Sequence, residues 1–167
     1  MTRSIGRQVG VFTGIVVLAA STFGLLAAPA GAATTNPCKV LRKSEIQQAF
    51  GGTVSSAKKG LSTAVSAQCE YQLSADGDRP DGTVVVHVMT TGGKAAYNGL
   101  KKTAAYEPID GVPSSLWAEK LHVVNLLEGS VLLGVQGNFI ITDPLPIHFY
   151  DAKTQLTDLA EIGAKRV

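Results

Sequence analysis

Two overlapping pairs of serine and lysine come closest to a catalytic pattern in this chain. Ser55 precedes Lys58, and Ser56 precedes Lys59, in the S-x-x-K spacing of penicillin-binding enzymes. In those enzymes a lysine next to the serine can take its proton and make it a nucleophile. That chemistry needs a helix that aligns both side chains, and it needs the companion motifs S-D-N and K-T-G. The sequence holds neither companion, and residues 53–59 are expected to form a strand, so we expect no serine nucleophile.

Histidine and acidic residues give no clearer indication of chemistry. A zinc or copper site needs several ligands that converge at short spacing, whereas His87, His122 and His148 share no motif. The acidic run at residues 76–82, Asp-Gly-Asp-Arg-Pro-Asp-Gly, has carboxylates of the kind that bind calcium or hydrolyse glycosides. Its glycines and proline make a solvated turn the simpler interpretation. We therefore expect no catalytic residue, no metal and no cofactor.

The first residues have the three parts of a secretory signal peptide. Arg3 and Arg7 are basic, residues 9–28 are nearly all apolar or small, and Ala30-Gly31-Ala32 matches an A-x-A cleavage site. The alternative is an uncleaved membrane anchor, because the apolar run approaches the roughly 20 residues that span a bilayer. Small and polar residues interrupt the run, and no basic stop-transfer cluster follows it. We expect cleavage after Ala32 and no stable membrane anchor after it.

Cleavage would define three segments: a signal peptide at 1–32, a short spacer at 33–36 and a single globular domain at 37–167. The whole chain has 15 basic and 13 acidic residues, and removal of Arg3 and Arg7 leaves 13 of each. A neutral domain lacks the basic face that neutralises phosphates, which argues against a nucleic-acid partner. We expect a protein that works outside the cell or at the cell envelope.

Two cysteines, Cys38 and Cys69, are the only ones in the chain, and both lie in the part expected to be exported. Because oxidising compartments favour disulfides, we expect these two residues to be bonded to each other. The alternative for Cys38 is lipid modification. Thr35-Asn36-Pro37 precedes it in place of the leucine and small residues of a lipobox, which argues against that alternative.

Hydrophobic periodicity predicts the elements that would position these residues. Residues 67–73 alternate strictly between apolar and polar, as half-buried strands do, and Ser44 with Gln47 three residues later is placed to cap a helix. The expected helices are 44–50, 94–105 and 147–165, and the expected strands are 53–59, 67–73, 83–89, 116–118, 121–127 and 130–136, with a loop at 137–146. This order predicts an α+β domain, a mainly antiparallel sheet with helices packed on one face.

Several short motifs resemble a domain of unknown function found in secreted proteins and lipoproteins of actinobacteria. The matching features are Pro37-Cys38, the helix at 41–51 with Glu45-Ile46 and Phe50-Gly51, the strand Cys69-Glu70-Tyr71, Gly111-Val112 before Trp117, the hairpin around Gly129, and the closing helix. The resemblance implies a disulfide between Cys38 and Cys69 and a place at the cell envelope, and it implies no reaction. Many such proteins carry a lipobox cysteine, and its absence here favours release.

Apolar residues outside the regular pattern are the candidates for contacts with a ligand or partner. These residues are Trp117, Phe139, Ile140 and Ile141. The alternative is that they fill the core, with 139–141 as another strand. We expect an exported, non-enzymatic binding or interaction protein whose partner is a small apolar ligand or an envelope protein. One alternative is a hydrolase of cell-envelope material with an unrecognised carboxylate site, and another is a structural or inhibitory protein with a filled core.

Overall fold

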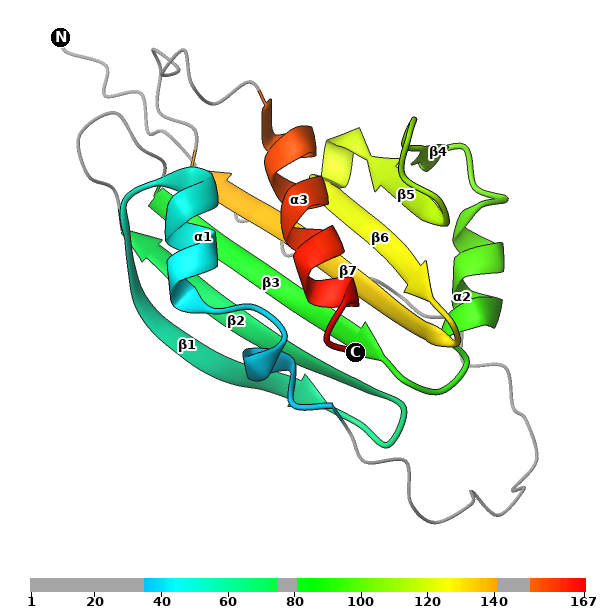
Figure 1. Cartoon of the computed structure of the whole chain (residues 1–167), viewed down its shortest axis with the longest axis horizontal. Coiled ribbons are helices and arrows are strands. Elements are labelled where there is room, and N and C mark those ends of the chain that lie inside the picture. The colour runs from blue at the N-terminus through cyan, green and yellow to red at the C-terminus, as the bar shows by residue number, and fades with distance from the viewer. Residues whose placement is uncertain (1–34, 75–80, 141–150) are drawn as a thin grey trace, which may run out of the picture. The chain divides into compact units, whose positions relative to one another are not determined.

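Seven strands of the described residues form one antiparallel sheet (Figure 1). The computed structural model describes residues 35–74, 81–140 and 151–167, so the predicted signal peptide and most of the acidic turn lie outside them. The strands are β1 (Thr53–Ser62), β2 (Ser66–Ser74), β3 (Asp81–Met89), β4 (Glu107–Pro108), β5 (Ser115–Ala118), β6 (Val123–Glu128) and β7 (Val131–Ile140). They lie in the order β1-β2-β3-β7-β6-β5-β4, so β7 pairs with β3 in the middle of the sheet and joins its two halves.

One face of the sheet carries the hydrophobic core. Along β2, Cys69 and Tyr71 are fully buried while Glu70 between them is exposed, which is the alternation that the sequence predicts. Their partners across β3 are Val86 and Val84, which are also fully buried. Side chains at paired positions of neighbouring strands lie on the same face, so the apolar residues of successive strands form one continuous layer.

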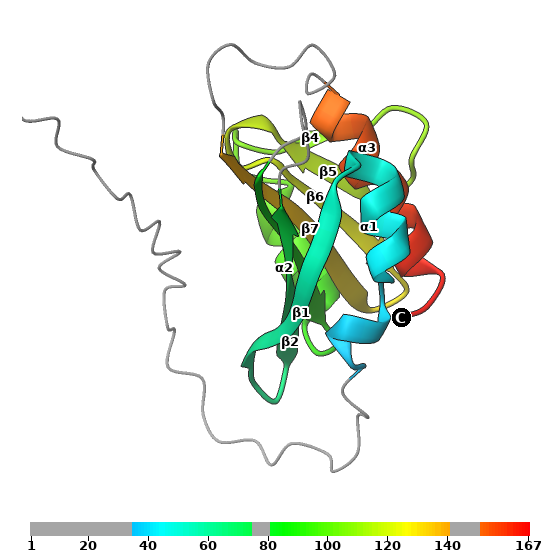
Figure 2. The same ribbon diagram turned by 90° about the vertical axis from the view of Figure 1, so that its left-hand side faces the viewer.

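Helices α1 (Lys43–Phe50) and α3 (Ala152–Ala164) cover this apolar face side by side (Figure 2). Leu156, Leu159 and Ala160 of α3 are buried against the sheet. The short helix α2 (Gly93–Leu100) lies at the other face, where Gly93 packs on Leu132 next to the β6–β7 hairpin. The α+β prediction is therefore confirmed, with two helices sharing one face and the third at the opposite one.

The disulfide between Cys38 and Cys69 is present, as predicted. It joins the short helix η1 (Pro37–Lys39) to the middle of β2, at the edge of the core. Next to it, the buried Tyr71 hydroxyl donates a hydrogen bond to the Leu41 carbonyl oxygen at 2.7 Å. The segment before α1 is therefore held to the sheet by both a covalent bond and a buried hydrogen bond.

The predicted cap of the first helix is wrong. Helix α1 begins at Lys43, so Ser44 lies inside its first turn and does not precede it. The Glu45 carboxylate instead accepts a hydrogen bond from the backbone N–H of Arg42 at 2.7 Å. A carboxylate in the first turn stabilises a helix because the free N–H groups and the helix dipole attract negative charge there.

Several predicted boundaries also differ from the structure. The loop predicted at 137–146 begins too early, because β7 continues to Ile140 and pairs Phe139 with Gly82. The second helix ends at Leu100 and not at residue 105, since the chain turns there and the Thr103 N–H bonds to the Leu100 carbonyl oxygen. The closing helix is present from Ala152, and residues 147–150 of its predicted range lie outside the described residues.

Candidate functional site

Strands β4 and β5 pair over two residues only, and a pocket opens where their pairing ends. Glu107 pairs with Trp117, and Pro108 with Leu116. Before Glu107 the chain turns, with the Tyr106 N–H bonded to the Thr103 carbonyl oxygen at 3.2 Å. After β5 the chain enters the short helix η2 (Glu119–Leu121). Because both segments leave the sheet at this point, no further strand pairing closes the space between them.

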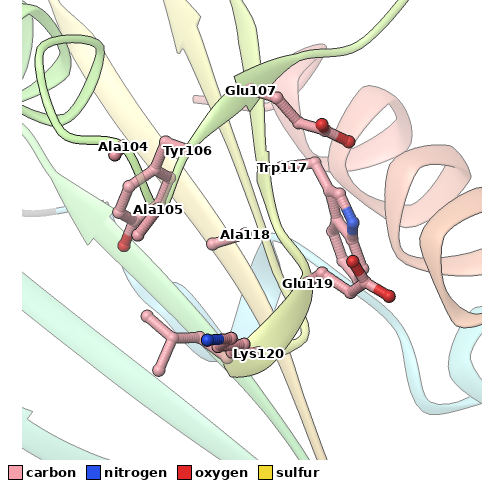
Figure 3. A pocket seen from close by; sticks show the side chains of 9 residues that line it. Ala104, Ala105, Tyr106, Glu107, Trp117, Ala118, Glu119 and Lys120 are labelled. Carbon is pink, nitrogen blue, oxygen red and sulfur yellow. The ribbon is translucent and has the colours of Figure 1, made fainter.

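This pocket has a volume of about 410 Å³, and we call it the β5 pocket (Figure 3). Its walls come from two stretches of chain, one that ends at Glu107 of β4 and one that runs from β5 through η2. The lining residues are Ala104, Ala105, Tyr106, Glu107, Trp117, Ala118, Glu119, Lys120 and Leu121. Aromatic and aliphatic surface is thus combined with two carboxylates and one ammonium group.

Tyr106 and Trp117 provide the aromatic walls. In Figure 3 their side chains lie on opposite sides of Ala118, with the Glu107 and Glu119 carboxylates on the Trp117 side. Trp117 is only 5% exposed, belongs to the core and stacks on the His122 ring at a centroid distance of 6.3 Å. A side chain held in this way provides a rigid wall, which lowers the entropic cost of binding.

Two polar groups at the pocket, Glu107 and Tyr106, are described by their contacts and burial. The Glu107 carboxylate accepts a hydrogen bond from the Lys153 ammonium at 3.1 Å, which links β4 to α3. Burial raises the pKa of the Tyr106 hydroxyl above its ordinary value of 10.0, so this group keeps its proton at neutral pH and can donate a hydrogen bond. The pocket can therefore offer a neutral donor together with charged groups of both signs.

Two of the sequence-predicted contact residues, Trp117 and Phe139, do not lie at the same site. Trp117 lines the β5 pocket, but Phe139 is absent from its walls and packs on Phe50 of α1 at a centroid distance of 5.0 Å. Phe139 thus follows the alternative interpretation, that of a strand residue packed against the core. Ile140 ends β7 and pairs with Asp81, and Ile141 lies outside the described residues.

The patterns considered for catalysis are dispersed. Ser56 and Lys59 lie on the regularly paired part of β1, where residues three apart point to opposite faces. Ser55 lies at a β-bulge, and its hydroxyl donates to the Gln72 carbonyl oxygen. His87 bonds to the Gln68 side chain at 2.7 Å, and its partial burial lowers the pKa of the ring. In the parts of the chain that the structure describes, no three His, Cys, Asp or Glu side chains meet in a group that could hold a metal ion.

Sequence reasoning missed most of the pocket. Glu107, Glu119, Lys120 and Leu121 have no motif, and they meet Tyr106 only because β4 folds back on β5. The signal that was present is the run of turn-forming residues between the two strands, Pro108, Gly111 and Pro113. Such residues mark a reversal of the chain but do not say how far apart its two arms will lie.

Comparisons of this chain with protein-family models, with curated proteins and with solved structures found no match. The helices in the described ranges are each too short or too polar to cross a membrane. The β5 pocket therefore has to be interpreted from its own residues.

Proposed function

We propose that this chain is an exported, non-enzymatic binding protein and that the β5 pocket holds its ligand. The observation that carries this proposal is a pocket of about 410 Å³ lined by Tyr106 and Trp117. Ligand sites of small molecules have volumes of roughly 300 to 1,000 Å³, with aromatic walls and a few polar groups. The disulfide between Cys38 and Cys69 supports a place in an oxidising compartment, outside the cell or at its envelope.

The lining indicates the chemistry of the ligand. The Trp117 and Tyr106 rings and the Leu121 side chain favour an apolar body. Glu119 and Lys120 are exposed at the η2 side and can bind polar groups of either charge. A small, mainly apolar molecule with a polar end fits this combination, and so does a short segment of an envelope protein with the same character.

The test is native mass spectrometry of the protein collected after export from the cells that make it. A bound ligand gives a native mass that exceeds the denatured mass by a small discrete amount. In the variant Ala105→Trp, the exposed Ala105 is replaced by a side chain large enough to obstruct the pocket, so the excess mass should disappear. Ala95→Trp changes an exposed alanine of α2 and is the matched control, which should keep the excess.

An excess mass that persists in Ala105→Trp would place the ligand elsewhere, and equal native and denatured masses in the parent protein would contradict a tightly bound small ligand. The denatured mass also fixes the N-terminus, so it tests cleavage after Ala32 in the same measurement.

A hydrolase is the second candidate, because Glu107 and Glu119 both line the β5 pocket and glycoside hydrolysis uses two carboxyl groups. The ion pair between Glu107 and Lys153 counts against it, since this carboxylate already has a partner. Release of soluble fragments from purified cell wall, lost in Glu119→Gln, would favour the hydrolase over the binding protein.

A further inference from the structure

The turn between β1 and β2 presents apolar side chains to solvent. Leu61 is 74% exposed and Val65 is 42% exposed, and only one other large hydrophobic residue of the described chain, Leu121, is comparably exposed. Single exposed apolar residues are ordinary on protein surfaces. Two of them at the end of one hairpin are not explained by packing, and we call residues 58–66 the β1–β2 tip.

The backbone of the β1–β2 tip is fixed by its own hydrogen bonds. The Thr63 hydroxyl accepts from the N–H groups of Val65 and Ser66, and the Thr63 N–H donates to the Ser66 carbonyl oxygen at 2.7 Å. The Val65 carbonyl oxygen accepts from the Thr90 N–H at 3.0 Å, which ties the turn to the end of β3. Leu61 and Val65 therefore extend from an ordered turn that is held by hydrogen bonds of Thr63, Val65 and Ser66.

Basic side chains surround these apolar ones. Lys58 and Lys59 are adjacent on β1, so their side chains leave opposite faces of the strand, and both are exposed. Lys59 pairs with Cys69, and the disulfide brings exposed Lys39 to the same end of the domain through its neighbour Cys38. Among the β2 residues that pair with this part of β1, the acidic one is Glu70, which lies opposite Lys58. The tip therefore has a positive charge next to its apolar residues.

The N-terminal part of the chain joins the domain at the β1–β2 tip. Thr35, Asn36 and Pro37 line a small hollow together with Lys59, Ser62 and Thr63. Because the chain is continuous, whatever precedes Thr35 is attached at this end. The expected signal sequence or its alternative, an uncleaved anchor, would hold this end of the domain near a membrane while it remains attached.

We propose that the β1–β2 tip docks on the surface of a lipid bilayer that contains anionic lipids. Leu61 and Val65 enter the boundary between headgroups and acyl chains, and Lys58, Lys59 and Lys39 contact the anionic headgroups. With two apolar side chains and three lysines the attachment is weak and reversible. It would keep the exported protein close to the envelope without a lipid anchor, and it is independent of the β5 pocket.

The test is co-sedimentation of the exported protein with vesicles of phosphatidylcholine alone and of phosphatidylcholine mixed with phosphatidylglycerol. Binding is expected to the mixed vesicles and to weaken as salt is added, because salt screens the lysines. The double variant Lys58→Gln/Lys59→Gln should lower the partition coefficient by about tenfold or more, since each basic residue near an anionic surface contributes strongly to binding. Leu61→Ser/Val65→Ser should lower it comparably.

The matched control lies elsewhere on the domain. Lys101→Gln/Lys102→Gln removes a second pair of exposed adjacent lysines. This control should bind the mixed vesicles like the parent protein. All these residues are exposed, and an unchanged thermal unfolding temperature verifies that each variant folds. Absence of binding to the mixed vesicles, or an equal loss in tip and control variants, would overturn the proposal, as would a soluble protein partner that binds the tip in its place.

Discussion

Arg166 holds the last turn of the chain to its first helix. Its guanidinium donates to both carboxylate oxygens of Glu45, at 2.6 and 2.8 Å, and to the Val40 carbonyl oxygen at 2.8 Å. Glu45 also accepts from the Arg42 N–H. The hydrogen bond from Arg166 is the largest of the effects that lower the pKa of Glu45, from an ordinary 4.5 to about 2. A bidentate contact of this kind fixes the relative orientation of the two side chains and also pairs their charges.

Replacing Glu45 by glutamine should make stability less dependent on pH. The folded pKa of Glu45 is depressed, so its charge stabilises the fold above the unfolded pKa of 4.5, and this contribution is lost as the pH falls toward 2. Glu45→Gln should lower the free energy of unfolding by about 1 kcal/mol near neutral pH, because the pair is partly exposed to water. Near pH 2 the variant and the parent should unfold at the same urea concentration.

Glu161→Gln is the control, because Glu161 is an exposed carboxylate of α3. It should leave the urea midpoint nearly unchanged at both pH values. A cost of Glu45→Gln that is equal near neutral pH and near pH 2 would show that the Glu45 charge does not contribute.

At the scale of elements, the sequence predicts the strands well and the ends of the helices poorly. Strand β2 has strict alternation because one side faces the core, so its pattern is determined by burial. Ser44 is a plausible cap by residue type. In the structure the Glu45 carboxylate accepts the hydrogen bond from the Arg42 N–H at the start of the helix, because its ion pair with Arg166 keeps it in that position. That partner lies 121 positions away, which no local pattern can indicate.

Strand β7 and the β5 pocket show the same limit. Phe139 continues β7 because β3 provides paired backbone groups up to Asp81, a partner that a local pattern does not indicate. Of the pocket's residues, the sequence indicates only Trp117, since the opening of the pocket depends on where the β4–β5 pairing ends. The pairing of strands therefore determines both where β7 ends and where the β5 pocket opens.

Two glycines of α2 should respond in opposite ways to alanine. A Cβ at Gly93 would lie 2.5 Å from the Ser130 carbonyl oxygen and 2.6 Å from the Leu132 nitrogen, both backbone atoms that cannot move alone. Gly93→Ala should therefore lower the free energy of unfolding by about 1 to 3 kcal/mol. A Cβ at Gly99 meets nothing within 4 Å, so Gly99→Ala should raise that free energy by about 0.5 kcal/mol. Urea unfolding measures both changes.

If both substitutions have the same sign and size, α2 does not pack on the β6–β7 hairpin. If Gly99→Ala alone is destabilising, the helix ends before Gly99. Either result would revise how α2 meets the sheet.

For the whole molecule, the disulfide adds a covalent link between the start of the domain and the sheet. Cys38 and Cys69 are 31 positions apart, and closing such a loop should stabilise the fold by about 3 to 4 kcal/mol through the entropy of the unfolded chain. Cys38→Ser/Cys69→Ser should lower the free energy of unfolding by this amount, as measured in urea. A reducing agent should bring the parent protein to the same value and leave the variant unchanged. A difference below about 1 kcal/mol would show that the loop is already restrained in the unfolded chain.

The contact of Arg166 with Val40 and Glu45 also has a consequence for when the protein can fold. Arg166 follows α3, and its partner Glu45 lies 121 positions earlier in the chain. A chain that is still being synthesised lacks this contact until Arg166 has emerged. Contacts of such long range slow folding, since the whole chain must close on itself. The start of α1 therefore gains this stabilising contact only once the segment that follows α3 is available.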